Sequence, residues 1–460
     1  MTKTAFSTLN LSSDLLKNLS TLGYQSMTEI QAQALPVILE GKDVIAQGKT
    51  GSGKTAAFGL GILQKLNVKR FRVQSLVLCP TRELADQVAQ EVRKLARATH
   101  NIKVLTLCGG MPFGPQIGSL EHGAHIIVGT PGRIQDHLSK GRLNLDNLTT
   151  LVLDEADRML EMGFQDALDA VIDSAPKKRQ TLMFSATYPE QIKKISQRIT
   201  VDPTFVKVES THDQLSISQH FYEVENNEQR LEAVRRLLLK YQPESSVVFC
   251  NTKKECQEVS NTLANYGFSA VALHGDLEQR DRDQTLVRFA NKSASVLVAT
   301  DVAARGLDIE SLDAVFNYHI AHDSEVHVHR IGRTGRAGSK GLACSLYSAK
   351  ELYKVGLLED YLDKVISPEA LPDASILDKP VIKAKMVTIQ IDGGKKQKVR
   401  PGDILGALTA KDGIEGKQVG KIKMFDVRAY VAVETKVSKK ALKILSQGKM
   451  KGRTFRARIV

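Results

Sequence analysis

The sequence has few cysteines, no C-x-x-C pair and no hydrophobic run long enough to cross a bilayer. Its five cysteines are odd in number, which disfavours a disulfide framework or a zinc site and predicts reduced thiols in core positions. No apolar run approaches the roughly 20 residues that a transmembrane helix needs. The polar opening stretch MTKTAFSTLN lacks the apolar core of a secretory signal. Together these absences predict a cytoplasmic protein.

Acidic residues are scarce in one part of the chain only. Residues 385–460 hold 19 Lys and Arg against 6 Asp and Glu, 19 − 6 = +13, which equals the net charge of +13 for all 460 residues. The preceding 384 residues therefore sum to about zero. A basic module on a neutral body predicts a polyanion partner, with nucleic acid foremost. A lysine-rich face kept for solubility is the alternative.

Strand and helix patterns divide the chain into four parts. Short β-branched or Leu-rich runs such as SLVLCP and LVLDE alternate with helical stretches over residues 1–209, and the alternation restarts over residues 210–366. This order predicts two α/β domains in tandem, each with a parallel sheet. Residues 367–384 contain prolines without clear periodicity and are expected to form a linker. Residues 385–460 follow a βαββαβ order, which predicts a small α+β domain.

The stretch GKTGSGKT, residues 48–55, fits G-x-x-x-x-G-K-[ST] between an expected strand and an expected helix. Its glycines allow backbone N–H groups to wrap a phosphate chain, along Gly51, Ser52 and Gly53. We expect Lys54 to reach the outer phosphates and the Thr55 hydroxyl to bind Mg²⁺. A chance glycine-rich turn is the alternative, which the flanking strand and helix disfavour. The motif thus predicts a nucleoside triphosphate and Mg²⁺ as cofactors.

Three carboxylates, Asp154, Glu155 and Asp157, follow a predicted strand within four residues. Crowded carboxylates repel one another unless a cation lies among them. Mg²⁺ bridging the β- and γ-phosphates is the cation that a phosphate loop implies. We therefore assign Asp154 to the metal and Glu155 to the attacking water. Two readings of Asp157 stay open, a direct catalytic role and a carboxylate that satisfies a helix N-terminus.

These motifs resemble those of the DEAD-box RNA helicases of superfamily 2, and residues 154–157 spell the family name. The resemblance covers almost all of residues 1–365, motif after motif in the family order, and implies two RecA-like domains. It implies that the nucleotide is ATP, with Gln31 reading the adenine and Phe6 packing on it. Met27 stands where the family has a proline. A side-chain amide offers both the donor and the acceptor that an adenine edge requires.

The resemblance also implies roles for residues that no local pattern would single out. Planar guanidinium groups suit the charge of a transferring phosphoryl group, and the stretch HRIGRTGR matches the family's source of arginine fingers. The fingers implied are Arg333 and Arg336, and Asp308 is implied as a ribose contact. Coupling of hydrolysis to strand separation is implied for Asp157, Ser185, Thr187 and His329.

An RNA track at the ends of the predicted strands is a further implication of the resemblance. The residues involved are mostly Gly, Thr and Arg, which suit phosphates and 2′-hydroxyls better than base edges. Binding by this track is therefore expected to be independent of base sequence. The residues assigned to it are Pro80, Thr81, Arg82, Gly110, Thr130, Arg133, Asn251, Thr252, Gln279, Arg282 and Thr300.

The basic residues 385–460 resemble an RNA recognition motif, and more closely the C-terminal domain of bacterial DEAD-box proteins that target 23S ribosomal RNA. Their expected central strand DVRAYVAV keeps one aromatic where a recognition motif carries several. Cations are therefore expected to carry more of the binding than sheet-face stacking does. A protein-binding module is the alternative. The residues assigned to RNA are Arg428, Tyr430, Lys451, Arg453, Arg456 and Arg458.

The predicted activity is RNA-stimulated hydrolysis of ATP to ADP and phosphate, coupled to local unwinding of short RNA duplexes. The predicted partner is 23S ribosomal RNA in large-subunit assembly particles, bound by a monomer and without a membrane. An ATP-gated RNA clamp or annealing factor and a DNA-directed superfamily 2 motor are the alternatives. A scaffold role would leave the proposed catalytic residues without a packing explanation, and these are Lys54, Asp154, Glu155, Arg333 and Arg336.

Overall fold

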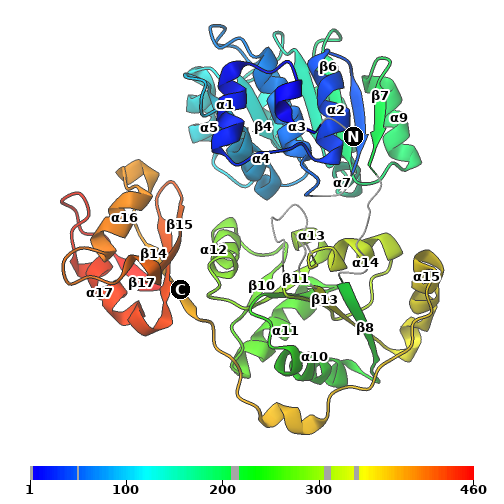
Figure 1. Ribbon diagram of the computed structural model, residues 1–460, viewed down its shortest axis with the longest axis vertical. Helices are drawn as coiled ribbons and strands as arrows, with labels where there is room; N and C mark the ends of the chain where they lie inside the picture. The colour runs from blue at the N-terminus through cyan, green and yellow to red at the C-terminus, as the bar shows by residue number, and fades with distance from the viewer. Residues whose placement is uncertain (1–3, 49–50, 209–216, 305–311, 336–340) are drawn as a thin grey trace. The chain divides into compact units, whose positions relative to one another are not determined.

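The computed structural model describes residues 4–48, 51–208, 217–304, 312–335 and 341–460 (Figure 1). The described residues up to 208 form one compact unit, and those from 217 onward form a second. Asp308 and Arg336, the predicted ribose contact and second arginine finger, lie outside the described residues. Within the described ranges, no helix combines the length and the apolar character needed to span a membrane.

The first unit is built on a seven-stranded parallel sheet in the order β3-β4-β2-β5-β6-β1-β7. Successive residues of a strand point to opposite faces, and here both faces are apolar. Val44 and Ala46 belong to one core cluster and Ile45 to another, so helices cover both faces. The strands are β1 (Val44–Gln47), β2 (Ser75–Leu78), β3 (Val104–Leu107), β4 (Ile126–Gly129), β5 (Thr150–Asp154), β6 (Gln180–Ser185) and β7 (Thr204–Lys207).

Nine helices of the first unit lie within the described residues. Helix α4 shows how the sequence sets their positions: Thr81 caps its N-terminus by accepting a hydrogen bond from the Leu84 N–H, and Leu84, Val88 and Val92 form its buried face. The helices are α1 (Ser13–Thr21), α2 (Glu29–Leu39), α3 (Lys54–Lys65), α4 (Arg82–Leu95), α5 (Phe113–Glu121), α6 (Pro131–Ser139), α7 (Ala156–Glu161), α8 (Gln165–Asp173) and α9 (Glu190–Ile199).

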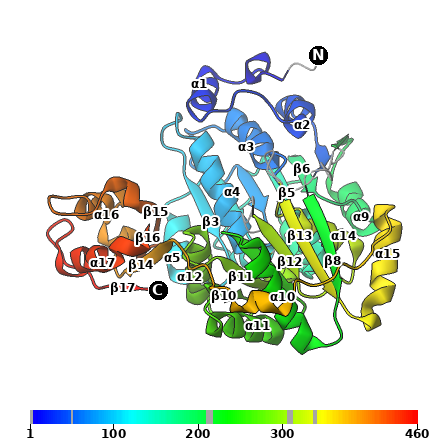
Figure 2. The same ribbon diagram turned by 60° about the horizontal axis from the view of Figure 1, so that its bottom comes forward.

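The second unit contains a six-stranded parallel sheet in the order β10-β11-β9-β12-β13-β8. Helices α10 and α11 pack their apolar residues on one face of it (Figure 2), and α15 packs on the other. The strands are β8 (Ile217–Glu223), β9 (Ser246–Cys250), β10 (Ala270–Leu273), β11 (Val296–Thr300), β12 (Ala314–Asn317) and β13 (Gly341–Tyr347). The helices are α10 (Asn227–Tyr241), α11 (Lys253–Asn265), α12 (Gln279–Ala290), α13 (Asp301–Ala304), α14 (Ser324–Ile331) and α15 (Leu352–Leu362), with a short 3-10 helix η3 (Ala349–Glu351).

The predicted linker, residues 367–384, is packed rather than loose. It forms a 3-10 helix, η4 (Ala374–Asp378), and Leu371, Ile376 and Leu377 pack against the core of the second unit. Arg236 of α10 donates a 2.9 Å hydrogen bond to the Pro372 carbonyl. The segment therefore adds to the second unit's core before the chain reaches the C-terminal domain.

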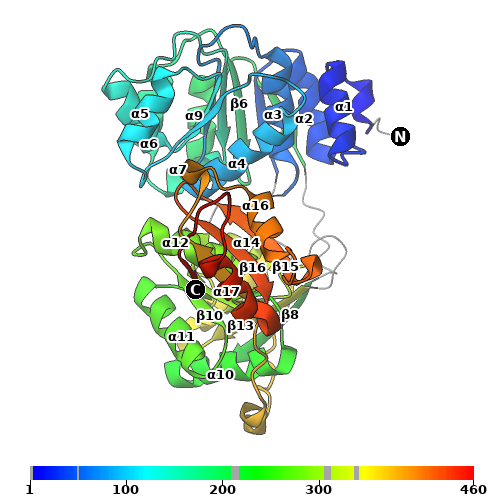
Figure 3. The same cartoon turned by 90° about the vertical axis from the view of Figure 1, so that its left-hand side faces the viewer.

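The C-terminal domain confirms the predicted βαββαβ order. Its antiparallel sheet has the order β15-β16-β14-β17, and two helices pack on one face of it (Figure 3). Ile389, Val431 and Leu445 belong to the core between sheet and helices. The elements are β14 (Met386–Ile391), α16 (Pro401–Leu408), β15 (Val419–Met424), β16 (Ala429–Glu434), α17 (Ser438–Gln447) and β17 (Ala457–Ile459).

Candidate active site and nucleic-acid interface

The phosphate loop follows β1 and leads into α3, which begins at Lys54. Gly51 and Gly53 have φ angles of 79° and 93°, in the left-handed region that favours glycine. A Cβ on Gly53 would lie 2.5 Å from Gln31 Nε2, so a side chain there would require Gln31 to move. The buried Lys54 ammonium donates a 2.9 Å hydrogen bond to the Gly48 carbonyl. A helix N-terminus with a buried cation is an arrangement that binds phosphate.

Asp154 ends β5, two strands from β1 in the sheet order, and its side chain is buried. Burial raises the pKa of Asp154 to about 7, against the opposing charge of Lys54 and together with the like charge of Glu155. Among the described residues, its Oδ1 has no hydrogen-bond partner. A buried carboxylate oxygen without a partner is costly unless a cation binds it, so the residue fits a metal ligand.

Glu155 has a φ of 54°, which is uncommon for a residue with a side chain. It occupies the N-cap position of α7 without a capping hydrogen bond from its side chain, and its Oε2 lies 4.0 Å from Arg158 Nε. Backbone strain of this kind concentrates at functional sites. The turn places two successive carboxylates, Asp154 and Glu155, at the end of one buried strand.

Asp157 is the point at which the DEAD motif contacts residues 185–187. Its Oδ2 accepts hydrogen bonds from the Ala186 N–H at 3.2 Å, the Thr187 N–H at 2.9 Å and the Thr187 hydroxyl at 2.9 Å. Its own N–H donates to Ser185 Oγ at 3.3 Å. The structure therefore shows that this carboxylate satisfies donors of another strand end and of its own helix, and a direct catalytic role for Asp157 stays a prediction.

Gln31 and Phe6 are both buried in the first unit. Gln31 Oε1 accepts from the Thr28 N–H at 2.9 Å, and Gln31 Nε2 donates to the Gly53 carbonyl at 3.0 Å. Thr28 in turn donates through its hydroxyl to the Ser52 carbonyl. The Phe6 ring packs edge-to-face on Tyr24 with centroids 6.1 Å apart. The structure thus ties Gln31 to the phosphate loop, and the adenine contacts of Gln31 and Phe6 stay predictions.

The predicted RNA track of the first unit lies at the carboxyl ends of β2, β3 and β4, which are neighbours in the sheet. Arg82 Nη1 donates to the Gly109 carbonyl at 3.2 Å, and the Gly109 N–H donates to Thr130 Oγ1 at 3.3 Å. Gly110 has a φ of 71°. Three loops far apart in sequence are therefore held together by their own hydrogen bonds, and the RNA contacts themselves stay predictions.

Arg133 is placed differently from what the sequence suggests, because its side chain is buried. Its Nη1 donates to the Met111 carbonyl at 2.8 Å and to Gln116 Oε1 at 3.0 Å. Phe113 lies under the guanidinium, with the ring centroid 4.1 Å from Cζ. The structure thus makes Arg133 an internal support of the loop that follows Gly110.

In the second unit, the predicted RNA residues lie after β9, at the start of α12 and at the end of β11. Thr252 caps α11 by accepting from the Glu255 N–H at 3.2 Å. Arg282 Nη2 donates to the Ala303 carbonyl at 2.7 Å, and Gln279 Nε2 donates to Asp283 at 2.7 Å. Thr300 ends β11 and is buried. Because β11 and β9 are paired, these groups belong to one edge of the sheet.

Sequence reasoning missed Arg330, which lies inside the HRIGRTGR stretch. It is buried, and its Nε and Nη2 each lie 2.7 Å from an oxygen of Asp301. Its Nη2 also donates to Asn251 Oδ1 at 3.4 Å. The arginine spacing of the motif would have revealed its presence, but only the fold reveals that it faces the strand ends. Arg333 lies two residues beyond the end of α14, and its carbonyl accepts from the Leu312 N–H.

Tyr430, which was assigned to RNA, is fully buried, so its ring is not available to stack on a base. It lies on the face of the small sheet opposite the helices, with Thr388 and Gln390, which are also buried. Thr388 Oγ1 lies 3.1 Å from Asn291 Nδ2 and 2.6 Å from Ser293 Oγ. This face is therefore packed within the second unit instead of lying open to solvent.

The other predicted tail residues differ in their partners. Lys451 lies 3.0 Å from Asp403, and Arg458 lies 3.2 Å from Asp392, while Arg428 is half-buried. Arg453 and Arg456 are exposed on the segment that leads into β17. Exposed guanidinium groups are the ones available to phosphates or unpaired bases.

A phosphate loop, a buried aspartate on a nearby strand and two tandem parallel-sheet units define an ATPase of the helicase type. Residues 28–195 match the DEAD/DEAH box helicase family, residues 229–338 match the helicase conserved C-terminal domain, and residues 388–459 match the DbpA RNA binding domain. The chain belongs to the DEAD-box family of ATP-dependent RNA helicases and ends in an RNA-binding domain of the DbpA type.

Individual relatives agree with this placement. The chain is 57% identical over 458 residues to ATP-dependent RNA helicase DbpA of Escherichia coli strain K12, which covers 99% of this chain and 100% of that protein. It is 44% identical over 346 residues to DEAD-box ATP-dependent RNA helicase CshA of Bacillus subtilis strain 168, covering 75% of this chain and 70% of that protein. The solved structure of S. cerevisiae Dbp5 bound to RNA and ADP BeF3 shares 30% identity at a TM-score of 0.73, covering 81% of this chain and 98% of that chain.

Proposed function

We propose that this protein unwinds or remodels short duplexes of 23S ribosomal RNA during assembly of the large ribosomal subunit, acting as a monomer in the cytoplasm. One observation carries the proposal: an ATPase core of about zero net charge is joined to a domain with 19 basic and 6 acidic residues. That domain matches the DbpA RNA binding domain over residues 388–459. A neutral core that hydrolyses ATP, joined to a basic domain that anchors it on RNA, would explain this charge distribution.

The chemical step is assigned to residues of both units. Lys54 and the α3 N-terminus bind the phosphates, and Glu155 orients the attacking water. Mg²⁺, when bound, would neutralise phosphate charge, and Asp154 and Thr55 are the residues that would hold it. Arg333 serves as an arginine finger. The unpartnered Asp154 Oδ1 supports the metal assignment.

Coupling to RNA is assigned to hydrogen bonds within each unit. The Asp157 carboxylate accepts from Ala186 and Thr187, so a shift of residues 154–157 on nucleotide binding would be passed on to residues 185–187. The turns that hold Arg82, Thr130 and Thr252 supply donors for RNA phosphates and 2′-hydroxyls. These groups do not read base identity, which leaves selection of the RNA to the basic domain.

Anchoring increases the effective concentration of the core at its target. A bound domain turns the core's own RNA contact into an intramolecular event, which raises avidity by about 10²–10⁴ when the linker spans the two sites. A weakly binding core then acts only near the anchored site. The exposed Arg453 and Arg456 are the side chains of the basic domain that we assign to this anchor.

The test is ATP hydrolysis with Mg²⁺ in the presence of no RNA, poly(A) or fragments of 23S ribosomal RNA at equal nucleotide concentration. We expect one ribosomal fragment to activate at much lower concentration than poly(A) does. The double substitution Arg453→Glu with Arg456→Glu should remove this preference and leave activation by concentrated poly(A). Lys439→Glu with Lys440→Glu is the matched control, because these exposed lysines of α17 carry the same charge change. Equal activation by every RNA would contradict targeting by the tail.

A further inference from the structure

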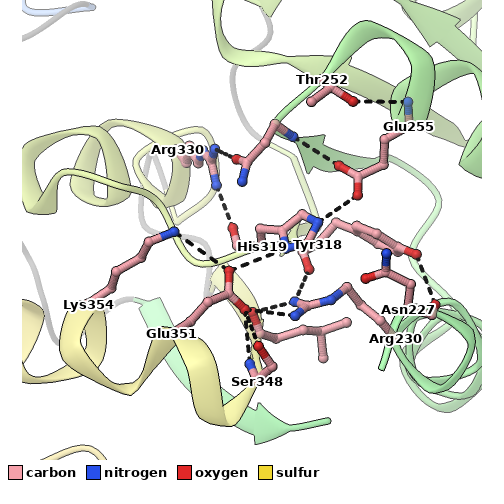
Figure 4. Close-up of polar contacts among 12 residues, drawn as sticks. Asn227, Arg230, Thr252, Glu255, Tyr318, His319, Arg330, Ser348, Glu351 and Lys354 are labelled. Atoms are coloured by element: carbon pink, nitrogen blue, oxygen red, sulfur yellow. Dashed lines mark hydrogen bonds and ion pairs between the residues drawn. The ribbon is translucent and has the colours of Figure 1, made fainter. Parts of the chain in front are cut away.

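His319 lies directly beyond β12, between two carboxylates (Figure 4). Its Nε2 is 2.6 Å from Glu255 Oε1, and its Nδ1 is 3.3 Å from Glu351 Oε1. A neutral imidazole has a single N–H, and an ionised carboxylate only accepts. Both contacts are therefore hydrogen bonds only when both ring nitrogens carry a proton. The geometry calls for an imidazolium at this position.

Burial and hydrogen bonding have opposite effects on the charged form of His319. Although burial disfavours the imidazolium, the hydrogen bonds to Glu255 and Glu351 outweigh it and raise the pKa of His319 above its ordinary value. Burial also favours neutral Glu351, yet donation from His319 and Ser348 and the charge of Arg230 hold the pKa of Glu351 below its usual range. Two charged groups contact the imidazole itself, Glu255 of α11 and Glu351 of η3. Glu351 also contacts Lys354 of α15 and Arg230 of α10. On the other side of Asn251 lie Arg330 of α14 and its partner Asp301 of α13.

One chain of contacts leads from His319 to the predicted RNA-binding turn. The second oxygen of Glu255 accepts from the Asn251 N–H at 3.2 Å, and the Glu255 N–H donates to Thr252 Oγ1 at 3.2 Å. Glu255 therefore fixes both residues of the turn, and His319 fixes the Glu255 carboxylate from the other side. Loss of the proton on Nε2 would leave Glu255 without its charged partner at 2.6 Å.

A second chain leads from His319 to the arginine-rich helix. The His319 carbonyl accepts from Arg330 Nη1 at 2.8 Å. The same guanidinium contacts Asp301 and Asn251, and the finger Arg333 lies three residues farther along the chain. His319 thus joins an RNA-binding turn to the segment that carries an arginine finger.

We propose that His319, in its doubly protonated form, is a positioning residue that couples RNA binding at Asn251–Thr252 to ATP hydrolysis. The imidazolium acts through the Glu255 carboxylate, which fixes the turn, whereas Arg330 contacts the backbone carbonyl of His319, a contact that is the same in either protonation state. This inference rests on the proposed role of the Asn251–Thr252 turn in RNA binding.

The direction of the pH effect follows from the folded protein favouring the protonated form. The bridge is complete below the ordinary histidine pKa of about 6.5, and it is lost as pH rises through the raised pKa of folded His319. The RNA concentration for half-maximal ATPase should therefore increase as pH rises through that folded value. An effect of about threefold to tenfold is the size by which residues that lie between two sites usually change the coupling of those sites.

The experiment measures RNA-stimulated ATPase of the full chain with poly(A) from about pH 6 to about pH 9, the range in which a histidine with a raised pKa titrates. In wild type, half-maximal RNA concentration should rise with pH. The His319→Gln variant should require a high RNA concentration for half-maximal ATPase at every pH, and its pH profile should lack the inflection. Its KM for ATP should be unchanged. Glu255→Gln should move the inflection to lower pH, because it removes a group that raises the pKa of His319.

His322→Gln is the matched control, an exposed histidine three residues along the chain, and its pH profile should equal that of wild type. Thermal unfolding of each variant at each pH checks the fold. Imidazole ¹⁵N NMR, assigned by comparison with His319→Gln, should show a doubly protonated ring near pH 7, above the ordinary value of about 6.5. A neutral ring there, or an unchanged inflection in His319→Gln, would overturn the proposal. Absence of any RNA stimulation at every pH would instead refute the proposed function.

Discussion

Asp157→Asn tests the link between the DEAD motif and residues 185–187. The Asp157 Oδ2 accepts three hydrogen bonds, at 3.2, 2.9 and 2.9 Å, from Ala186 and Thr187, and Oδ1 accepts one at 3.0 Å from the Arg158 N–H. Hydrogen bonds to a charged acceptor contribute about 1.5–3 kcal/mol, and those to a neutral acceptor about 0.5–1.5 kcal/mol. An asparagine can keep the three hydrogen bonds accepted by its side-chain oxygen. Its NH2 group then faces the Arg158 N–H, so that two donors meet and this hydrogen bond is lost.

The expected cost is about 2 kcal/mol in the free energy of unfolding of the first unit, since these contacts share one oxygen and do not add fully. The chain has no tryptophan, so Phe71→Trp, at a side chain that is 42% exposed, gives a fluorescence signal for this unit alone. If the free energy of unfolding falls by about 3 kcal/mol per molar urea, the urea concentration at the unfolding midpoint should fall by about 0.7 M.

A double-mutant cycle with Thr187→Val isolates the link itself. Because the Thr187 hydroxyl donates to Asp157, the two substitutions should show a coupling free energy of about 1 kcal/mol. Additive effects, within about 0.3 kcal/mol, would contradict this link, because they would mean that the two side chains do not share an interaction in solution.

Three further predictions concern the phosphate loop, the thiols and the tail. Gly53→Ala should raise the KM for ATP at least about tenfold, because a φ of 93° and a 2.5 Å approach to Gln31 both disfavour a Cβ; an unchanged KM would contradict this. All five cysteines are buried and free, and burial raises the pKa of Cys108 to about 12, so Ellman's reagent should react only after unfolding; fast reaction of the native protein would be the contrary result. Replacing Arg453 and Arg456 by Gln should reduce the slope of log affinity for single-stranded RNA against log salt by about 1.4, and an unchanged slope would show that neither contacts a phosphate.

The sequence allowed the two parallel sheets and the small antiparallel domain to be predicted, because their buried strands are short apolar runs between helical stretches. It did not predict β7 or β8, since TFVK and ISQHFYE mix polar and apolar residues at partly exposed positions. The linker was predicted as irregular, yet Leu371 and Ile376 pack on the second unit. Such packing depends on what lies beside the segment in space, which local periodicity does not encode.

The candidate site was predictable where chemistry fixes spacing along the chain, as in the phosphate loop and residues 154–157. Contacts between distant positions were not. Glu255 and His319 are 64 residues apart in the chain, and His319 and Glu351 are 32 apart; they meet because β12 pairs with β9 and β13. For Tyr430, the strand was predicted correctly, but the burial of its outer face depends on packing within the second unit.

Targeting of the ATPase core by the basic domain is tested most directly by strand displacement with a short labelled duplex placed beside a fragment of 23S ribosomal RNA. The same duplex beside a scrambled RNA of equal length is the comparison, and both are incubated with ATP, Mg²⁺ and a low concentration of the full chain. We expect displacement beside the ribosomal fragment at protein concentrations that leave the scrambled substrate intact, and loss of that difference with Arg453→Glu and Arg456→Glu. Equal displacement of both substrates by the unmodified chain would contradict the claim that the basic domain directs the ATPase core to its RNA.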